Sequence, residues 1–341
     1  KGVGARLFLR FKQYVGYPIY LCWSLVFKER ADAVVVCTNT FYVPFLATFF
    51  HRKVIHLVYD LFPEAMVHAG KWEEGTFKVR LIRWITQQTF KRASANVFLG
   101  NRLKAYCEGQ YGVIHNSVII PVGGDERLFC GVKGDFSAGG RVGEADVPRI
   151  LYCGNFGNMH DSGTLFGSWK ALVIKVGREG KEMFPWWFFH CSGPKRALVE
   201  ATKMELPEEL QERIVLGEGL DQERWVETML SAEVALVTMV SGAEQVVMPS
   251  KTYSAMLAGQ AILAIAPEDS DLVDTIKEAD CGWWVTPGDI DGLLQVLLEI
   301  TKYDQLVMMK RRNAFKYAHQ HFGQNRLALN WIKLFNDSLS R

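Results

Sequence analysis

One short stretch carries the clearest chemistry in the sequence, the run EQVVMPSKTYSAMLAG that begins at Glu244. Pro249 suits the first turn of a helix and Ser250 can cap it, so a helix should begin here. Lys251 then lies where the helix dipole favours anions over cations. We therefore predict that Lys251 binds an anionic ligand. The Glu244 carboxylate, on the approach to this helix, would accept hydrogen bonds from sugar hydroxyls.

The same arrangement recurs in CSGPKRALVE, where a strand-like run is followed by Lys195 and Arg196 in the first turn of a helix. Two cations at a helix start are unfavourable unless an anion compensates them. A second anion contact and a pair of solvated surface charges both fit the sequence at this point.

A glycine-containing turn precedes a third helix, in YCGNFGNMHDSGT. A strand should end at Gly154, followed by Asn155, Phe156 and Gly157, with a helix from about Ser162. Glycine lets the backbone approach a ligand closely, and the helix that follows favours negative charge. We predict that this turn contacts phosphate, with an ordinary strand-to-helix turn as the alternative.

Polar residues also follow two strand-like runs in the first half of the chain. In VYDLFPEAMVHAGK a strand ends at Asp60, and in CTNTFYVP another ends at Thr38. Carboxylates at the carboxyl end of a parallel strand point toward the ligand side of a sheet. We predict that Asp60 orients or deprotonates a hydroxyl acceptor, whereas capping of the next helix is its simpler alternative. The predicted acceptor-side residues are Thr38, Asn39, Thr40, Glu64 and His68.

These residues require a scaffold of alternating strands and helices, and the apolar pattern predicts one. Ten mostly apolar runs predict strands buried on both faces, as in a parallel sheet. They lie at 32–38, 53–60, 95–100, 117–123, 149–155, 186–193, 213–219, 234–240, 261–267 and 282–288. Helices are predicted between them, at 73–92, 162–177, 197–204, 221–231 and 290–301. This alternation indicates an α/β, doubly wound architecture.

The glycine-rich run from Cys130 to Val147 separates two halves. We predict a Rossmann-like domain over 1–135, a linker over 136–147 and a second Rossmann-like domain over 148–324. A helix over 325–341 would pack back on the first domain, and the two domains would face a cleft. The first half opens on helix-like residues. Either the opening strands of this domain are missing from the chain, or the domain is abbreviated.

Composition excludes several classes of protein. The net charge of +2 is too balanced for nucleic-acid binding through bulk charge. Seven cysteines without a C-x-x-C spacing favour reduced thiols and a cytoplasmic protein, with no zinc site. The D-x-D runs at 269–271 and 289–291 more readily cap helices than bind metal, so no metal is expected. No dinucleotide fingerprint, Walker A motif or signal peptide pattern is present in the sequence.

Taken together, these motifs resemble the GT-B glycosyltransferases, in particular the glycosyltransferase 4-like group of bacterial surface polysaccharide synthesis. GNFGNMHD, MPSKTYSAMLAGQAILAI and DCGWWVTPGDIDGL resemble successive donor-domain motifs of that group, and YDLFPE resembles its acceptor-domain signature. The resemblance covers nearly the whole chain.

The resemblance implies that the second domain binds a sugar nucleotide. This ligand would be a substrate, so no cofactor is expected. Its diphosphate would lie between the Gly154–Gly157 turn and the helix that starts at Ser250, neutralised by Lys195, Arg196 and Lys251. Its base and ribose would lie near Gly219 and Leu220. Members commonly have two glutamates eight residues apart; Glu244 fits the first, but Thr252 occupies the second position.

The resemblance also implies a reaction: transfer of a sugar from a UDP- or GDP-sugar to a lipid-linked or growing glycan, without metal and with retention. Basic and aromatic residues between Arg6 and Tyr20 suit a membrane surface, although a packed amphipathic helix explains them equally well. The protein would then be cytoplasmic and peripheral at the inner face of the cell membrane. Alternatives are a nucleotide-sugar epimerase of the same fold and a non-catalytic sugar-nucleotide-binding module.

Overall fold

The computed structural model describes residues 3–28, 31–38, 40–132, 147–245, 249–302 and 304–339. These residues divide into two units, which are described separately. The first unit is built mainly from residues up to Pro121 and from Ala328 onward, and the second from Val122–Glu244 and Pro249–Leu327. Residues 122–132 thus group with the second unit, although the sequence placed them in the first. The predicted linker, apart from Val147, lies outside the described residues.

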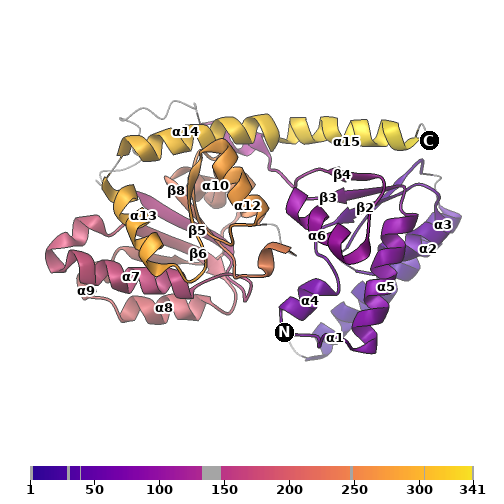
Figure 1. Ribbon diagram of the computed structural model, residues 1–341, viewed down its shortest axis with the longest axis horizontal. Helices are drawn as coiled ribbons and strands as arrows, with labels where there is room; N and C mark the ends of the chain where they lie inside the picture. The colour runs from indigo at the N-terminus through magenta and orange to yellow at the C-terminus, as the bar shows by residue number, and fades with distance from the viewer. Residues whose placement is uncertain are drawn as a thin grey trace. The chain divides into compact units, whose positions relative to one another are not determined.

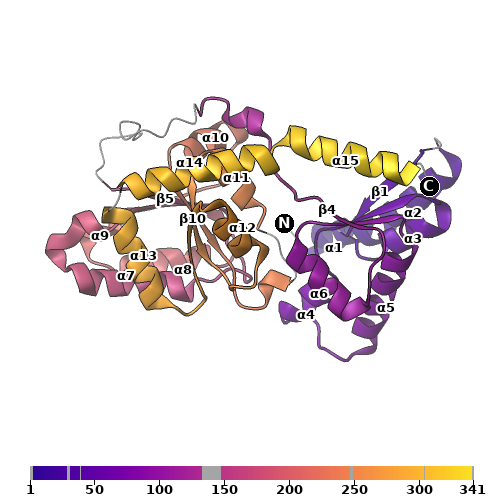
Figure 2. The ribbon, with the colours of Figure 1, turned by 45° about the horizontal axis from the view of Figure 1, so that its top comes forward.

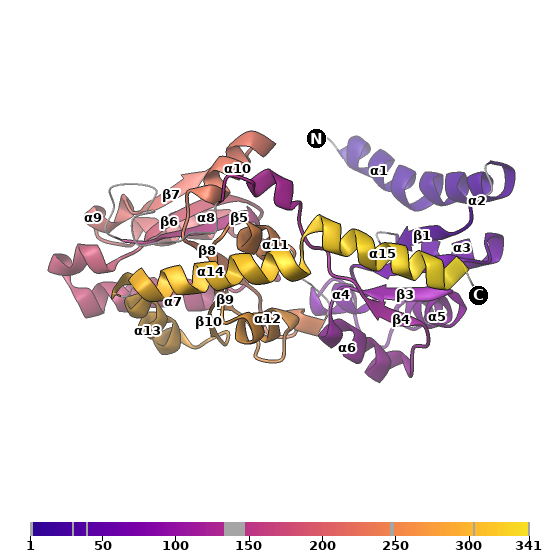
Figure 3. The same cartoon turned by 90° about the horizontal axis from the view of Figure 1, so that it is seen from above.

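The first unit contains a parallel sheet in the order β1-β2-β3-β4 (Figure 1). Its strands are β1 (Val34–Cys37), β2 (Val54–Val58), β3 (Ala95–Phe98) and β4 (Ser117–Ile119). Its helices are α1 (Val3–Phe11), α2 (Tyr17–Phe27), α3 (Val43–Phe50), α4 (Glu64–His68), α5 (Phe77–Arg92) and α6 (Asn101–Tyr111). A π-helical segment, Lys12–Gly16, joins α1 to α2, which together run along one margin of the unit (Figure 3).

The second unit contains a six-stranded parallel sheet in the order β10-β9-β8-β5-β6-β7. Its strands are β5 (Arg149–Asn155), β6 (Trp186–Ser192), β7 (Ile214–Gly217), β8 (Val234–Thr238), β9 (Ala261–Ile265) and β10 (Gly282–Val285). This is the strand order of a Rossmann fold, with β5 as its first strand. All ten strands predicted from the sequence are confirmed, and most end a few residues earlier than predicted.

Helices cover both faces of the second sheet (Figures 1 and 2). On one face α7 and α13 pack together, and on the other α14 packs against α11 and α12. The helices are α7 (Gly163–Val176), α8 (Arg196–Met204), α9 (Glu208–Gln211), α10 (Gln222–Leu230), α11 (Lys251–Leu257), α12 (Asp271–Ala279), α13 (Ile290–Lys302) and α14 (Asp304–His321). The buried aromatic residues Tyr152, Phe156, Trp169, Trp187 and Phe189 fill the core on the α7 face.

The C-terminal helix α15 spans Gln324–Leu339. Its residues from Ala328 onward group with the first unit, where Lys53 Nζ donates a hydrogen bond of 2.7 Å to the carbonyl of Leu339. The two D-x-D runs lie at helix starts. Ser270 Oγ accepts from the backbone N–H of Val273, and Asp289 Oδ1 accepts from that of Gly292. Helix capping at both runs is therefore confirmed.

Candidate active site

The strand order of the second sheet reverses between β5 and β8, and ligands of such sheets bind beyond the carboxyl ends of the strands at this point. The two loops that leave β5 and β8 are joined here. His160 Nδ1 lies 2.7 Å from the carbonyl oxygen of Thr238, and the backbone N–H of Val240 donates to the carbonyl of Met159 at 3.0 Å. The loops that carry the predicted donor residues therefore form one surface.

Gly154 and Lys251 meet at this edge. Gly154 has a φ of +127°, which glycine adopts at little cost. A Cβ at this position would lie 3.9 Å from Lys251 Nζ, so the glycine leaves the space beside the ammonium open. On its other side Lys251 Nζ lies 3.8 Å from the centre of the Tyr152 ring, whose negative face attracts a cation. Gly154 and Lys251 are therefore neighbours, and the predicted diphosphate between them stays a prediction.

The ammonium of Lys251 has no hydrogen-bond partner, although its nitrogen is buried. Burial lowers the pKa of Lys251 to about 7, and the facing thiols of Cys153 and Cys191 oppose this only in part. The pKa of each of these thiols is itself raised, chiefly by burial. A buried amine without a partner is costly, and an anion beside it would restore its charge.

Among the described residues of this unit, Tyr253 and Gln260 each have a buried side-chain oxygen without a hydrogen-bond partner, and three more such oxygens belong to residues on or next to the β8 edge. They are Glu244 Oε2, which lies in the 3₁₀ turn Ala243–Gln245, Thr238 Oγ1 at the end of β8, and Thr252 Oγ1 in α11. No ion pair joins Glu244 to Lys251 in the part of the chain that the structure describes. Buried polar atoms are almost always paired in folded proteins, so these oxygens are candidates for hydrogen bonds to a ligand, although the core of the unit also contains unpartnered atoms such as Trp169 Nε1 and Trp187 Nε1.

His160 is a member of this site that the sequence analysis missed. Because a carbonyl oxygen only accepts, the contact with Thr238 requires the hydrogen on Nδ1 and leaves Nε2 with a free lone pair. Burial and then the charge of Lys251 lower the pKa of His160 to about 4. The histidine is therefore neutral at physiological pH. Its position in GNMHD, three residues after Gly157, was the available signal.

Lys195 and Arg196 have different surroundings. Lys195 Nζ donates to the carbonyl of His160, so this ammonium belongs to the same edge, and burial lowers its pKa. Arg196 Nη1 donates to the carbonyls of Cys191, at 3.0 Å, and Gly217. Its guanidinium therefore bonds to the backbone of β6 and β7, and its role in phosphate binding stays a prediction.

The predicted phosphate turn is held by close backbone contacts. The N–H of Phe156 donates to the carbonyl of Ser192 at 2.7 Å, and its ring is fully buried, so only its backbone is available to a ligand. Gly193 has a φ of +99°, and a Cβ there would lie 2.8 Å from the Phe156 carbonyl oxygen. Asn155 is exposed at this turn, and Gly157 accepts from the N–H of His160.

The remaining donor-side residues are less tightly placed. Gly219 is exposed after β7, with open space where a Cβ would stand, and Leu220 beside it is half-buried. Pro249 is buried, whereas Ser250 is exposed and its side chain makes no capping hydrogen bond. The expected cap is therefore absent. Because α11 has only seven residues, Lys251 itself is the main source of positive charge here.

In the first unit, Asp60 follows β2 and Thr38 holds its backbone. Thr38 Oγ1 accepts hydrogen bonds of 3.1 Å from the N–H groups of Tyr59 and Asp60. Asp60 also borders a very small cavity; the residue as a whole is exposed, and partial burial of its carboxyl group raises the pKa. Thr40 is buried and lies near the Gln13 carbonyl, and Asn39 lies outside the described residues.

Glu64 is buried in an ion pair rather than free at a surface. Its Oε1 accepts from Arg83 Nε at 3.0 Å and from the Tyr111 hydroxyl at 2.8 Å, while its Oε2 is buried without a partner. Arg83 also contacts Glu74, and hydrogen bonds to the two glutamates hold the pKa of Arg83 above its usual range. His68 is exposed in the last turn of α4. Glu64 thus packs α4 against α5, and an additional role toward the acceptor stays a prediction.

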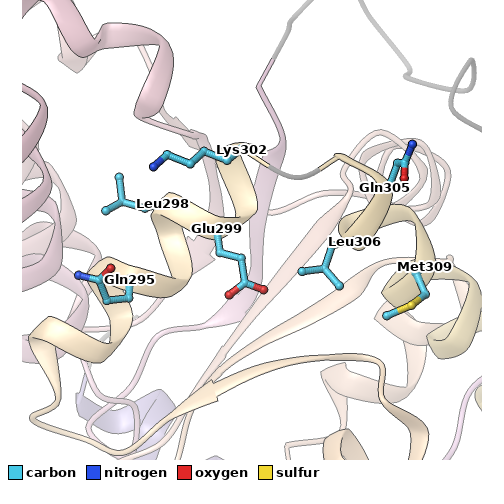
Figure 4. Close-up of a pocket in the computed structure, with 7 residues that line it drawn as sticks. All are labelled: Gln295, Leu298, Glu299, Lys302, Gln305, Leu306 and Met309. Carbon is cyan, nitrogen blue, oxygen red and sulfur yellow. The ribbon is translucent and has the colours of Figure 1, made fainter.

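Two other features of the described residues bear on the location of the site. No group of three or more His, Cys, Asp or Glu side chains there is arranged to hold a metal ion. A broad open pocket lies between α13 and α14, bordered by Leu298, Glu299, Lys302 and Leu306 among others (Figure 4). It is formed by the second half of α13, so it lies toward the amino ends of the strands, away from Lys251.

No family model matches the chain. Its sequence is similar to that of a probable glycosyltransferase, WbjE of Pseudomonas aeruginosa, with 25% identity over 283 residues, or 81% of this chain and 68% of that protein.

Its structure is similar to those of several solved proteins. Sucrose-phosphate synthase from Thermosynechococcus elongatus has a TM-score of 0.68 at 17% identity, covering 90% of this chain and 74% of that one. Anabaena HepE in complex with UDP has a TM-score of 0.69 at 12% identity, covering 94% and 82%. WaaG, a glycosyltransferase involved in lipopolysaccharide biosynthesis, has a TM-score of 0.59 at 16% identity, covering 85% and 78%.

Two parallel α/β units with this strand order and these neighbours define the GT-B fold. The similarity in sequence to a glycosyltransferase adds the class of enzyme. The chain therefore has the GT-B fold, and its similarity to a probable glycosyltransferase supports an enzyme of that class.

Proposed function

We propose that this enzyme transfers a sugar from a UDP- or GDP-sugar to a hydroxyl group of a lipid-linked or growing glycan. The observation that carries the proposal is the buried, unpartnered ammonium of Lys251 beside Gly154, at the point where the strand order reverses. An anion is the ligand that such a group lacks. HepE has been solved with UDP and with UDP-glucose, which supports a nucleotide diphosphate as that anion.

In this proposal the diphosphate leaving group lies against Lys251 and the Gly154–Gly157 turn. Negative charge develops on the leaving oxygen as the glycosidic bond breaks, and a fixed cation in a dry site stabilises it strongly. Lys195 adds a second positive charge at the same edge, close to the His160 carbonyl. Glu244 and the hydroxyl of Thr252 are the candidate partners of the sugar and ribose hydroxyls, because both have unpaired buried oxygens.

The acceptor part of the proposal rests on the first unit. Asp60 is the proposed group for orienting or deprotonating the acceptor hydroxyl, and its raised pKa makes it a better base than an ordinary aspartate. We propose a retaining reaction in which the acceptor attacks on the face that the diphosphate leaves. We also propose that lysine side chains, rather than a metal ion, neutralise the diphosphate. The role of WaaG in lipopolysaccharide biosynthesis supports a surface glycan as product.

The first experiment is a thermal shift measurement against UDP, GDP and a panel of their sugar derivatives. A ligand that binds only the folded state increases the free energy of unfolding by mass action, by about 2.7 kcal/mol at a hundredfold excess over Kd. Tm rises as a result. We expect stabilisation by one nucleotide series, and we expect Lys251→Ala to abolish it. Lys175→Ala, at an exposed lysine of the same unit, is the matched control. Stabilisation that survives in Lys251→Ala would contradict the diphosphate assignment.

The second experiment identifies the reaction with the selected donor. Release of free nucleotide that depends on an added glycan acceptor supports transfer, whereas an epimerised sugar nucleotide formed without acceptor would contradict it. Proton NMR of the new glycosidic bond tests retention. Activity that is unchanged by EDTA and by added Mg²⁺ supports metal independence, and a loss in EDTA that Mg²⁺ restores would overturn that part.

A further inference from the structure

Strand β7 lies at one edge of the second sheet, and its carboxyl end leads into Gly219 and Leu220 (Figure 3). It has four residues and pairs with β6 in a register that ends at His190 and Gly217. A short strand at a sheet edge opens more readily than a central one, because fewer hydrogen bonds hold it. The residues after β7 therefore keep a fixed position only if side chains support the end of the strand.

Arg196 ties the carboxyl ends of β6 and β7 together. Its Nη1 donates to the carbonyl oxygen of Cys191, at 3.0 Å, and to that of Gly217. Cys191 lies one residue beyond the last register pair on β6, so the guanidinium continues the connection between the two strands past the end of their ladder. Hydrogen bonds from a charged donor are about twice as strong as those between neutral groups. One arginine thus fastens the last residue of β7 to the neighbouring strand.

His190 contacts the same strand end. A Cβ at Gly217 would lie 2.2 Å from His190 Nδ1, so the imidazole ring lies directly against the backbone of β7, and a side chain there would displace it. Nδ1 also lies 3.4 Å from the carbonyl oxygen of Glu218. Because a carbonyl oxygen only accepts, this long hydrogen bond requires the hydrogen on Nδ1. Arg196 and His190 together therefore hold the backbone of Gly217 and Glu218.

The loop after β7 lies within reach of a nucleotide whose diphosphate contacts Lys251. Neighbouring strands are about 4.8 Å apart, so the end of β7 lies about 10 Å along the sheet edge from the end of β5, two strands away. This distance is comparable to that between the diphosphate and the base of an extended nucleotide. Gly219 is exposed, with open space where a side chain would stand, so a base could contact its backbone directly.

We propose that Arg196 and His190 are positioning residues that set the preference for one nucleobase, by holding the backbone of residues 218–220 in place. A backbone N–H or carbonyl group distinguishes two bases only if it is fixed, because a hydrogen bond weakens steeply with distance and angle. A loop that moves would adjust to either base. The inference rests on the proposed function, since it requires a nucleotide at this sheet edge, and it adds the residues that select the base.

Two nucleotides that differ only in the base test the proposal. UDP and CDP have the same ribose and diphosphate, and their bases exchange a hydrogen-bond donor and an acceptor. If the guanine series stabilises the wild type, GDP and ADP replace them. We expect Arg196→Met to lower the ratio of the two affinities roughly tenfold, the effect of about one hydrogen bond to the base. Inorganic pyrophosphate, which has no base, should bind equally to the variant and the wild type.

Two variants of His190 separate its hydrogen bond from its packing. His190→Phe keeps a ring against Gly217 and removes the donor, and we expect the affinity ratio to fall about threefold, since the lost hydrogen bond is long. His190→Asn retains a donor at the same distance from the main chain and should lie closer to the wild type. Arg312→Met, at an exposed arginine of α14, is the control for Arg196→Met and should keep the wild-type ratio.

Hydrogen exchange gives a readout that needs no nucleotide. The amides of residues 217–220 should exchange faster in Arg196→Met than in the wild type. If exchange rises throughout the second sheet, the two His190 variants decide the outcome through their affinity ratios. Equal losses for both nucleotides and pyrophosphate would show that Arg196 contacts the diphosphate and would overturn the proposal, as would unchanged ratios in the variants. Absence of nucleotide binding by the wild type would contradict the proposed function itself, and this inference with it.

Discussion

Two threonines at the carboxyl ends of strands have opposite hydrogen-bonding states. Thr38, after β1, accepts from two backbone N–H groups, whereas Thr238, at the end of β8, has a buried hydroxyl oxygen without a partner. The carboxylates and cations follow this division only in part, because Glu64 Oε2 in the first unit is also buried without a partner. Glu64 pairs with Arg83 in the first unit, while Glu244 and Lys251 in the second both have unpaired buried atoms.

If the proposed function is right, this difference separates an edge whose polar groups are mostly paired on folding from an edge whose polar groups the donor would pair. An unpaired buried polar group costs about 1–3 kcal/mol, so the second sheet edge holds a reserve of unfavourable free energy that ligand binding can recover. At the edge of the first sheet, most of the polar groups already form hydrogen bonds on folding, so little of this cost remains. Substitutions at the first edge should therefore reduce stability, and substitutions at the second should reduce donor binding and turnover.

Replacement of Lys251 should have the largest effect. We expect Lys251→Ala to lower kcat/KM for the sugar nucleotide by about 10²–10³-fold, because a fixed charge at the leaving group is lost. Lys251→Met should at the same time raise the free energy of unfolding near pH 7, by roughly 2 kcal/mol or more, since a buried amine with a depressed pKa is removed. Kinetics and thermal unfolding, with Lys175→Ala as control, measure both. A variant that is less stable and fully active would reverse the comparison.

Breaking the ion pair of the first unit should have the next largest effect. Arg83→Met leaves the Glu64 carboxylate buried without its cation, and we expect a loss of about 3 kcal/mol in unfolding free energy with little change in donor affinity. Arg80→Met, at an exposed arginine of the same helix, is the control. Chemical denaturation and donor titration provide the two readouts. A weakened donor affinity with unchanged stability would place Arg83 in the binding site instead.

The pH dependence of donor binding sharpens the role of Lys251. Below pH 7 the free amine is protonated, and above pH 7 binding must take up a proton to restore its charge. Affinity for a sugar nucleotide, whose diphosphate does not titrate in this range, should be constant below pH 7 and fall about tenfold per pH unit above it. His160, with a pKa of about 4, contributes nothing in this range. Calorimetric titration at several pH values should show an affinity that falls above pH 7 for the wild type and an affinity that is constant with pH for Lys251→Arg.

The smallest effects come from the same substitution at two threonines. Thr38→Val removes the acceptor of two N–H groups and should cost about 1–2 kcal/mol of stability. Thr252→Val removes a buried hydroxyl that has no partner, so it should leave stability unchanged or raised and weaken donor binding about fivefold. Parallel unfolding and binding curves distinguish them. Equal losses of stability in both variants would remove the distinction between the two edges.

The strands could be predicted from the sequence because parallel strands buried on both faces are continuous apolar runs bounded by turn residues. The association of Gly154 with Lys251 could also be anticipated, since both follow strands of one sheet. The ion-pair partner of Glu64 could not be predicted from the sequence. Arg83 lies 19 residues further along the chain on another helix, and no local pattern connects the two.

Side-chain direction was the other property that the sequence did not determine. Arg196 has the right type and position for an anion, yet it donates to carbonyls of its own sheet. Phe156 lies within the predicted phosphate turn, yet its ring is fully buried in the core. His160 belongs to the site because its ring reaches across to the Thr238 carbonyl, a contact that depends on how the loops after β5 and β8 are placed.

Gly193 and Gly219, two of the glycines in the second unit, differ in how much change they allow. Any side chain at Gly193 would collide with the carbonyl of Phe156, and its positive φ already disfavours one. Gly219 has open space around it and no such backbone constraint. Natural variation and protein engineering can therefore alter the surface around Gly219 while the turn beside Gly193 stays unchanged. If the base lies near Gly219 as the resemblance implies, a library of side chains at position 219 should alter nucleotide preference.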